Sequence, residues 1–314
     1  MRKPILVTSL VTAAILMAGC GGSDEGGGGG DTVVRIAGNS NAAALPVWVG
    51  IEHGFFKDCG VDAKYTLIEN ISTLPSALGK SFDVALSVPP LLVTAADQGI
   101  GIKEVAGATL NTRENPQTFM VVPEGSDIKS AKDLEGKTLG VQTITGSTHL
   151  GTKMWLKEAG VPYDSINVVQ VDGPAQADQL EAGRLDAVET LAPFSTSVLK
   201  LGHSIFDPQS SIAPEVSGIF WTASPTWIDK NADGLDCFRE GLDKAREFIE
   251  GNDEEAKAVL EKQTGLPAEV VEETVLPTYT SDVRPDDLEK WENAMKEVGG
   301  FTGDVDVASL VVEN

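Results

Sequence analysis

The chain has 314 residues, of which 41% are hydrophobic and 23% are charged, an ordinary composition for a globular protein. Its formal net charge is −23 at pH 7, which argues against nucleic acid as a partner because no basic face is available to pair with phosphates. The acidity is typical of a protein kept dispersed by like charge, and it does not make the ligand a cation. A chain of this length favours two domains over one.

The first residues have the pattern of a secretory signal. Arg2 and Lys3 precede the apolar run PILVTSLVTAAILMAG, which ends at Cys20. This run is shorter than the roughly 20 residues that a membrane-spanning helix needs. The small residues before Cys20 resemble a bacterial lipobox, although Met17 stands where Leu is usual. We therefore expect residues 1–20 to be a lipoprotein signal peptide and Cys20 to carry the lipid. An ordinary cleaved signal with an incidental cysteine is the alternative.

Residues 21–31 contain GGSDEGGGGG, which predicts a flexible tether with nothing to bury. No later segment has about 18 consecutive apolar residues, so no further membrane span is expected. A lipid anchor followed by a tether would hold the folded part of the chain at the bacterial cell membrane without inserting it. We expect an extracytoplasmic, lipid-anchored protein.

That location places the remaining thiols in an oxidising compartment. With Cys20 used for lipid, Cys59 and Cys237 form an even pair, which predicts a disulfide; two buried free thiols are the alternative. The three histidines of the chain fall into no metal-ligand spacing, so we expect neither a metal site nor a Cys–His nucleophile. No cofactor is expected.

The first half of the chain alternates between strands and helices. The β-branched alternation of TVVRIAG predicts a first strand, and Gly and Pro mark the later boundaries. We expect strands at 32–38, 62–69, 82–88 and 102–109, and helices at about 45–54, 72–80 and 89–99. This order predicts an α/β fold with a mostly parallel sheet.

The pattern restarts in the second half, and one phrase recurs. ALGKSFDVALSVPP (77–90) and LEAGRLDAVETLAPF (180–194) each pass from a helical end through Leu, Gly and Asp into a strand that runs towards a Pro. We interpret the repeat as two similar α/β lobes, in which this turn carries a helix into a strand ending at a cleft. Helices are expected at 130–136, 147–160 and 174–183, and strands at 137–144, 165–172 and 185–191.

The last third of the chain is mainly helical, with helices expected at 237–251, 252–265, 268–275 and 286–299. These helices need a surface to cover, and we assign them to the first lobe. The extended runs QTFMVVPE (117–124) and SGIFWTAS (217–224) are expected to cross between the lobes as a hinge. Lobe 1 is then discontinuous, at 32–117 and 222–314, and lobe 2 spans 118–221.

Several phrases, taken in order, resemble one known family. They are LPVWVGIEHGFFKDCGVDAKY, SALGKSFDVALS, SDIKSAKDLEGKTLGV, LEAGRLDAVETLAPF and NDEEAKAVLEKQTGLPAEVVEET. Together they resemble ABC-transporter substrate-binding lipoproteins of the nitrate/sulfonate/taurine type, a family that includes binders of thiamine pyrimidine precursors. The resemblance implies a two-lobed periplasmic-binding-protein fold that closes on a small molecule and delivers it to an ABC permease driven by a cytoplasmic ATPase.

A binding protein without enzymatic activity, acting as a monomer, is therefore the leading interpretation. Pyrimidine-synthesising enzymes share the architecture, but they need a Cys-rich motif, and the two cysteines other than Cys20 stand elsewhere. A tethered ligand sensor is a further alternative that the sequence does not separate from a transporter.

Candidate contacts lie at the expected strand ends. Asn39 and Ser40 follow the first strand, where they either bind ligand or serve the turn. Trp48, in the next helix, either stacks on ligand or packs in the core. Ser87 and Phe194 end the two repeated phrases.

Two further candidates lie on expected strands. Glu189 is expected to face solvent; in the cleft it would disfavour a simple anion and favour an amine or ring N–H. Trp221 lines the cleft or belongs to the hinge core.

The stretch TGSTH has the clearest chemistry. Gly146, Ser147, Thr148 and His149 open a helix, whose free N–H groups and dipole suit an anion. Ordinary capping by Ser147 or Thr148 is the alternative. The predicted ligand is a small organic anion, a sulfonate or carboxylate with an apolar or aromatic body. A heterocycle such as a thiamine pyrimidine precursor or riboflavin is the second hypothesis.

Overall fold

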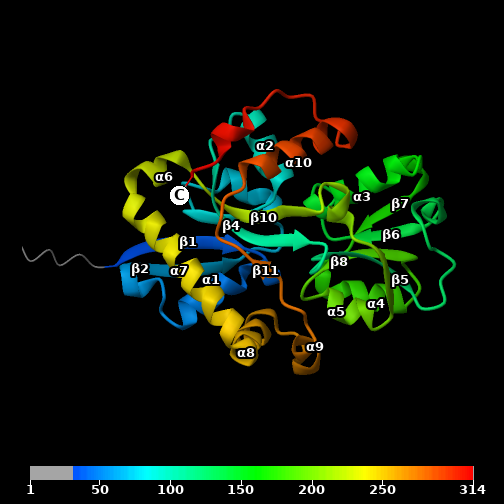
Figure 1. Cartoon of the computed structure of the whole chain (residues 1–314), viewed down its shortest axis with the longest axis horizontal. Helices are drawn as coiled ribbons and strands as arrows, with labels where there is room; N and C mark the ends of the chain where they lie inside the picture. The colour runs from blue at the N-terminus through cyan, green and yellow to red at the C-terminus, as the bar shows by residue number, and fades with distance from the viewer. Residues whose placement is uncertain (1–30, 314) are drawn as a thin grey trace, which may run out of the picture. The chain divides into compact units, whose positions relative to one another are not determined.

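The structure is a computed structural model that describes residues 31–313. Cys20, the expected signal peptide and all of the expected tether except Asp31 lie outside the described residues. Residues 31–313 contain two sheets with helices packed around each (Figure 1). The α/β fold with two lobes predicted from the sequence is therefore confirmed.

The first sheet has the strand order β11-β4-β10-β3-β1-β2. β1 lies between β2 and β3 and is parallel to both, whereas β10 runs antiparallel to both β3 and β4. The strands are β1 (Thr32–Gly38), β2 (Val61–Leu67), β3 (Val84–Ser87), β4 (Lys103–Thr112), β10 (Glu215–Ala223) and β11 (Thr278–Tyr279).

The second sheet has the order β7-β6-β8-β5-β9, which repeats the order β2-β1-β3-β10-β4 of the first. β6 lies between β7 and β8 and is parallel to both, and β5 runs antiparallel to β8 and β9. The strands are β5 (Thr118–Pro123), β6 (Thr138–Val141), β7 (Asn167–Gln170), β8 (Ala187–Leu191) and β9 (Gly202–Phe206). Each lobe thus has the same strand order, and in each the antiparallel strand follows a crossing from the other lobe.

The second crossing lies earlier in the chain than expected. The whole of β10, from Glu215, pairs within the first sheet, and β9 ends at Phe206 in the second. The boundary expected at 221/222 therefore falls inside a continuous strand. The extended run SGIFWTAS was expected to cross between the lobes, but the chain crosses between Phe206 and Glu215, before β10 begins. The first crossing precedes β5, which begins at Thr118 in the second sheet.

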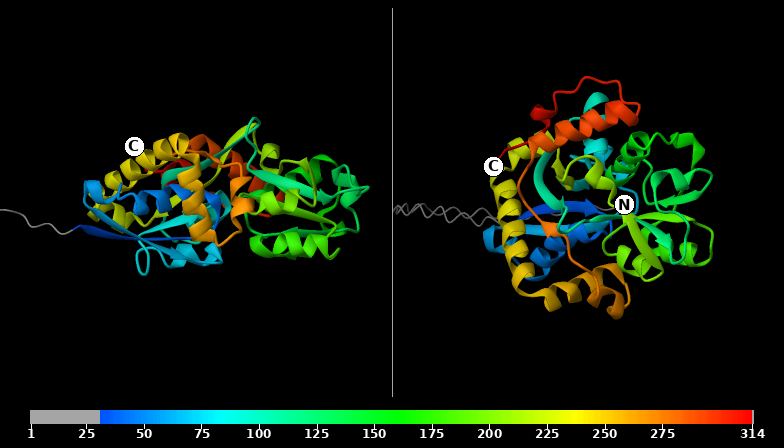
Figure 2. Two further views of the ribbon diagram at one scale, coloured as in Figure 1. Left: turned by 90° about the horizontal axis from the view of Figure 1, so that it is seen from below. Right: turned by 45° about the vertical axis from the view of Figure 1, so that its right-hand side comes forward.

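The C-terminal helices cover the first lobe, as expected (Figure 2). Helix α7 packs on α1, and α10 packs on α2. The first-lobe helices are α1 (Leu45–Glu52), α2 (Pro89–Asp97), α6 (Pro225–Lys230), α7 (Ala232–Gly251), α8 (Asp253–Thr264), α9 (Ala268–Glu272) and α10 (Pro285–Val298). The second lobe has α3 (Ser147–Glu158), α4 (Gln176–Glu181) and α5 (Ser195–Leu199).

The helix expected at 72–80 is instead a short 3-10 helix, Ile71–Ser76. Pro75 lies inside it, and a proline removes a backbone donor and clashes with the preceding turn of an α-helix. The N-cap is Asn70, whose side chain accepts a hydrogen bond from the Ser72 N–H, rather than a Ser or Thr. Another short helix, expected at 130–136, is a 3-10 helix over Ala131–Leu134.

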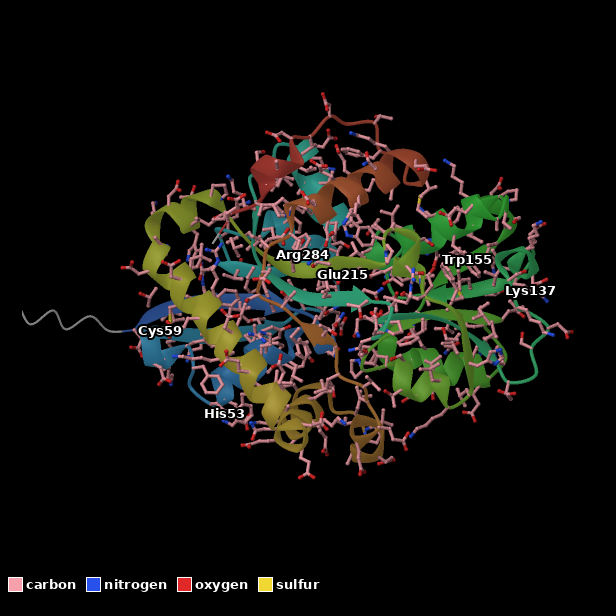
Figure 3. The ribbon with its side chains drawn as sticks, viewed as in Figure 1. His53, Cys59, Lys137, Trp155, Glu215 and Arg284 are labelled. Atoms are coloured by element: carbon pink, nitrogen blue, oxygen red, sulfur yellow. A yellow bond between two sulfur atoms is a disulfide. The ribbon has the colours of Figure 1, made fainter. Side chains whose placement is uncertain are left out.

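Helices and sheets bury separate apolar clusters on the two faces of each sheet. In the first lobe, a disulfide joins Cys59, just before β2, to Cys237 on α7, with a Cα–Cα distance of 5.6 Å (Figure 3). This bond connects segments 178 residues apart. None of the helices described between residues 31 and 313 is both long and apolar enough to cross a membrane.

Candidate functional site

A pocket lies between the two lobes, with residues from both sheets in its wall. Its cavity volume is about 50 Å³ in this conformation, smaller than the roughly 300–1,000 Å³ usual for a small-molecule site. We call it the interlobe pocket. It is lined by Asn39, Asn41, Ile71, Val88, Leu91, Gln142, Thr143, Gly146, Ser147, Thr148, Glu189, Leu191 and Ile219.

Two amides face this pocket from equivalent places in the two lobes. Asn39 directly follows β1, and Gln142 directly follows β6, the central parallel strand of the other sheet. Within the described residues, Oδ1 of Asn39 and Nε2 of Gln142 are buried and have no hydrogen-bond partner. An unsatisfied buried polar atom costs about 1–3 kcal/mol, so both atoms are well placed to bind polar groups of a ligand.

The N-terminus of α3 is open towards the pocket. Its N-cap is Gly146, and no side chain of the described residues caps it. The hydroxyl of Ser147 instead donates to the Gly218 carbonyl of β10, at 3.0 Å, and so links the lobes. Capping by Ser147 or Thr148, the alternative considered from the sequence, does not occur. The first-turn N–H groups therefore keep their partial positive charge for a ligand.

Glu189 does not face solvent, which corrects the expected orientation. It lies on β8, which pairs with neighbouring strands on both sides, and only 3% of the residue is exposed. Its Oε1 lies 2.7 Å from Nδ1 of His149, and its backbone carbonyl accepts a hydrogen bond from Gln176. The sequence did not reveal that helices cover both faces of this strand. The carboxylate lines the interlobe pocket.

His149 lies behind Glu189 rather than in the pocket wall. Its side chain is fully buried, and its Nε2 lies 2.7 Å from the hydroxyl of Tyr163. Tyr163 was not among the residues selected from the sequence. No sequence pattern marks it, because it reaches His149 from the turn that follows α3.

The other candidates do not line the interlobe pocket. Trp221 packs edge-on against Phe238 in the first-lobe core, with ring centroids 5.9 Å apart. Phe194 packs against the backbone of Gly173. Ser40 is partly exposed, and Ser87 is buried. Trp221 and Phe194 are aromatic, which favoured them as ligand contacts, but packing within the lobes buries both side chains away from the pocket.

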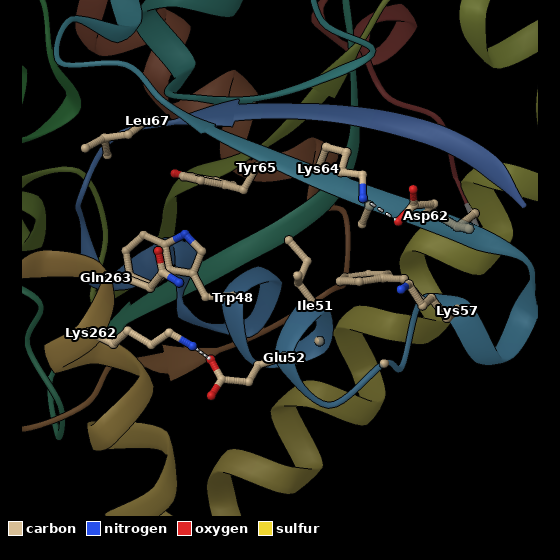
Figure 4. Close-up of a pocket in the computed structure, with 15 residues that line it drawn as sticks. Trp48, Ile51, Glu52, Lys57, Asp62, Lys64, Tyr65, Leu67, Lys262 and Gln263 are labelled. Atoms are coloured by element: carbon tan, nitrogen blue, oxygen red, sulfur yellow. Dashed lines mark hydrogen bonds and ion pairs between the residues drawn. The ribbon is translucent and has the colours of Figure 1, made fainter.

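Trp48 lines a larger groove on the first lobe, between α1, β2 and α8 (Figure 4). The cavity volume of this groove is about 440 Å³. Four of its charged side chains already pair with one another: Lys64 with Asp62 at 2.8 Å, and Lys262 with Glu52 at 2.7 Å. We favour the smaller interlobe pocket because unpaired polar atoms from two lobes converge there, together with an uncapped helix end.

Trp48 also supports the interlobe pocket from behind. Its indole packs edge-on against the ring of Tyr65, with centroids 5.6 Å apart. The Tyr65 hydroxyl donates to the backbone carbonyl of Asn39 at 2.8 Å. The Trp48–Tyr65 pair therefore holds the loop that presents Asn39, although the indole itself lies outside the pocket wall.

Two α/β lobes of equal strand order, joined by two crossings and holding a pocket between them, define the periplasmic-binding-protein fold. The family model described as NMT1/THI5 like matches residues 41–256, and the chain belongs to this family. The resemblance found in the sequence is thereby confirmed.

Known proteins agree with this assignment. A formylaminopyrimidine-binding protein of Halalkalibacterium halodurans is 26% identical over 312 residues, covering 93% of this chain and 92% of the relative. A putative ABC transporter periplasmic binding protein of Brachyspira hyodysenteriae is 24% identical over 218 residues, covering 65% and 63%. Among solved structures, the aliphatic sulphonate binding protein SsuA of Escherichia coli aligns with a TM-score of 0.73 and 18% identity, over 89% of this chain and 97% of that one.

Proposed function

We propose that this chain is the solute-binding component of an ABC importer and that it acts outside the cytoplasm. It captures a small organic molecule in the interlobe pocket and presents it to a permease driven by a cytoplasmic ATPase. The observation that carries the proposal is the convergence of Asn39, Gln142 and the open end of α3 on one pocket between two lobes. Relatives described as periplasmic binding proteins of ABC transporters support it. The proposal includes a monomer without enzymatic activity.

The ligand that we propose is a small organic anion with an apolar body. The first-turn N–H groups of α3 would hold its acidic group, since no Lys or Arg is among the residues described as lining the pocket. Five apolar side chains would contact its body: Ile71, Val88, Leu91, Leu191 and Ile219. A bare inorganic ion would leave these apolar side chains without a contact.

A second candidate ligand is a neutral heterocycle, and Glu189 is the observation that favours it. A buried carboxylate in the pocket wall repels a simple anion but accepts a hydrogen bond from a ring N–H or an amine. The formylaminopyrimidine-binding relative supports this candidate. An organic acid that also carries an N–H group would satisfy both the α3 terminus and Glu189.

A thermal-shift screen of the chain from Asp31 onward tests the proposal. The compounds are alkyl and aryl sulfonates, carboxylates, nitrate, aminopyrimidines and riboflavin. A ligand at about a hundred times its Kd should add about 2.7 kcal/mol and raise Tm by a few degrees.

A matched pair of variants assigns the pocket. Gln142→Ala should raise the Kd of the bound compound about tenfold or more. Gln263→Ala, the same change in the first-lobe groove, should leave the Kd unchanged. The opposite result would place the ligand in the groove.

The membrane anchor is part of the same proposal. Cys20 would carry the lipid, and the glycine-rich segment after it would tether the lobes near the permease. Cys20→Ser should release the protein from the membrane fraction of bacteria that produce it. Retention of the variant at the membrane would contradict the lipid anchor. Loss of uptake of the identified ligand on deletion of the gene would separate an importer component from a sensor.

A further inference from the structure

Three hydrogen-bonded side chains lead from the interlobe pocket to the surface of the second lobe. Glu189 lines the pocket, its Oε1 lies 2.7 Å from Nδ1 of His149, and Nε2 of His149 lies 2.7 Å from the hydroxyl of Tyr163. The side chains of Glu189 and His149 are 2% and 0% exposed, whereas Tyr163 is 36% exposed. Ligand capture explains why Glu189 faces the pocket, but it does not explain why His149 and Tyr163 are hydrogen-bonded behind it.

The partners of His149 allow two states in which its Nδ1 donates to a Glu189 carboxylate. If His149 is neutral, the ring proton lies on Nδ1, and the Tyr163 hydroxyl donates to Nε2. If His149 is charged, both nitrogens carry protons, and the Tyr163 oxygen accepts from Nε2. In both states, the Nδ1–H group donates to Oε1 of Glu189.

The second carboxylate oxygen of Glu189 is left for the ligand. Within residues 31–313, no side chain or backbone N–H donates a hydrogen bond to Oε2. A carboxylate bound through one oxygen to a buried imidazole cannot turn freely. Its other oxygen is therefore preorganised as an acceptor.

We propose that His149 is a positioning residue that donates from Nδ1 to Oε1 of Glu189 and so directs the other carboxylate oxygen towards an N–H donor of the ligand, with Tyr163 holding the imidazole at Nε2. This inference rests on the proposed function and adds to it a basis for selectivity. The pocket would prefer a ligand with an N–H group over a ligand of the same shape that presents a methyl group there. A ligand without such a donor would leave the buried carboxylate oxygen unsatisfied.

The residues around Glu189, His149 and Tyr163 agree with this arrangement. Lys153 lies with its Nζ 4.6 Å from the centre of the Tyr163 ring. Burial, and then the negative charge of Glu189, raise the pKa of Tyr163, so its hydroxyl stays protonated and able to donate. Gln176 holds the backbone of Glu189 from the opposite side.

The first test needs no ligand. Nitrogen NMR of the ¹⁵N-labelled chain should place a ring proton of His149 on Nδ1, and the ¹³C carboxyl signal of Glu189 should be that of a carboxylate. A proton on Nε2 with a bare Nδ1 would overturn the proposal, because a protonated Glu189 would then have to donate to His149. This measurement uses the unmodified chain, so it does not depend on whether a variant folds.

The second test compares two probes, 4-amino-2-methylpyrimidine and 2,4-dimethylpyrimidine, which differ by an amine against a methyl group. The unmodified chain should prefer the amine about tenfold or more. His149→Asn places an amide N–H near the Nδ1 position and should keep most of the preference, whereas His149→Gln places it near Nε2 and should lose it. His203→Asn, a change at a half-exposed histidine on β9, is the control and should change nothing.

The outcomes separate the two proposals. Equal preference for the amine in both His149 variants and in the unmodified chain would overturn the role of His149 while leaving the pocket in place. Binding of neither probe, together with binding of a sulfonate or carboxylate without N–H groups, would overturn the selectivity but not the capture function. Absence of any ligand in the thermal-shift screen would overturn the proposed function itself.

Discussion

Asp83 and Asp186 make the same backbone contact in the two lobes. Oδ2 of Asp83 accepts a hydrogen bond from the Arg35 N–H of β1, at 2.9 Å, and Oδ2 of Asp186 accepts one from the Thr138 N–H of β6, at 2.8 Å. In each case the partner lies 48 residues earlier in the chain. The repeated Leu-Gly-Asp phrase therefore ties the turn before β3 or β8 to the neighbouring parallel strand, β1 or β6, of its own sheet.

The two lobes should respond differently to loss of this aspartate. Asp83 also binds the Arg35 guanidinium through Nε and Nη2, whereas Asp186 has only the backbone bond among the contacts described. We expect Asp83→Ala to lower the free energy of unfolding by about 2–3 kcal/mol and Asp186→Ala by about 1 kcal/mol. Urea denaturation of the chain from Asp31 measures both. Equal losses would show that the Arg35 pair adds nothing to the backbone bond.

Much of the fold could be predicted because its signals are local. Alternation of apolar residues marked β1 and β2, and the Gly and Pro boundaries marked α1 and α2. The repeat predicted two lobes, since the same turn chemistry recurs at Asp83 and Asp186. The exact crossing point could not be predicted, because β10 is one continuous strand whose sheet is chosen by its neighbours.

The candidate site was predicted in part. Asn39, the α3 terminus and Glu189 do line the interlobe pocket, and strand ends and helix starts are recognisable from sequence. Gln142 was missed, although the repeat contained the signal: it follows β6 as Asn39 follows β1. The burial of Glu189 depends on helices that cover both faces of β8, and a single strand pattern does not carry that information.

The disulfide should contribute strongly to the stability of the first lobe. Cys59 and Cys237 close a loop of 178 residues, and a cross-link of this kind adds about 2–4 kcal/mol by restricting the unfolded chain. Replacing both cysteines by Ala should lower the free energy of unfolding by that amount. Reduction of the unmodified chain should give the same loss, whereas the double variant should not respond to reductant. Peptide mapping without reductant that finds both thiols free would contradict the bond.

Glu104 should make stability depend on pH. It lies on β4 and is 1% exposed; burial, opposed by a backbone hydrogen bond from Arg284, raises its pKa to about 8 from 4.5. Between these values the folded chain holds a proton that the unfolded chain has released, so this group's contribution to stability falls as pH rises from about 4.5 to about 8. The loss is on the order of 5 kcal/mol at most.

The variant Glu104→Gln removes this titration while keeping the shape of the side chain. We expect the variant to be more stable than the unmodified chain at pH 9, and to lose less stability between pH 5 and pH 9. Glu124→Gln, whose side chain is 85% exposed in the unmodified protein, is the control and should leave the pH profile unchanged. Identical profiles for Glu104→Gln and the unmodified chain would mean that Glu104 ionises in the folded state as it does in water.

Two surface ion pairs connect the lobes and should bias their closure. Lys157 of α3 pairs with Glu297 of α10 at 2.9 Å, and Lys200, which follows α5, pairs with Glu273, which follows α9, at 2.8 Å. Each is about half exposed, so each is worth only about 0.2–1 kcal/mol. Lys157→Glu places like charges together and should favour the open state, weakening ligand binding a few-fold at low salt.

Reversal of both charges separates this effect from damage to α3. The double variant Lys157→Glu, Glu297→Lys restores the attraction and should recover the Kd of the unmodified chain, whereas Glu297→Lys alone should weaken binding like Lys157→Glu. High salt should remove the difference among all four proteins, because exposed charges are screened beyond roughly 10 Å at 0.1 M. X-ray scattering without ligand should show a larger radius of gyration for the single variants. Weaker binding that persists in the double variant would instead assign the loss to the packing of α3 against α10.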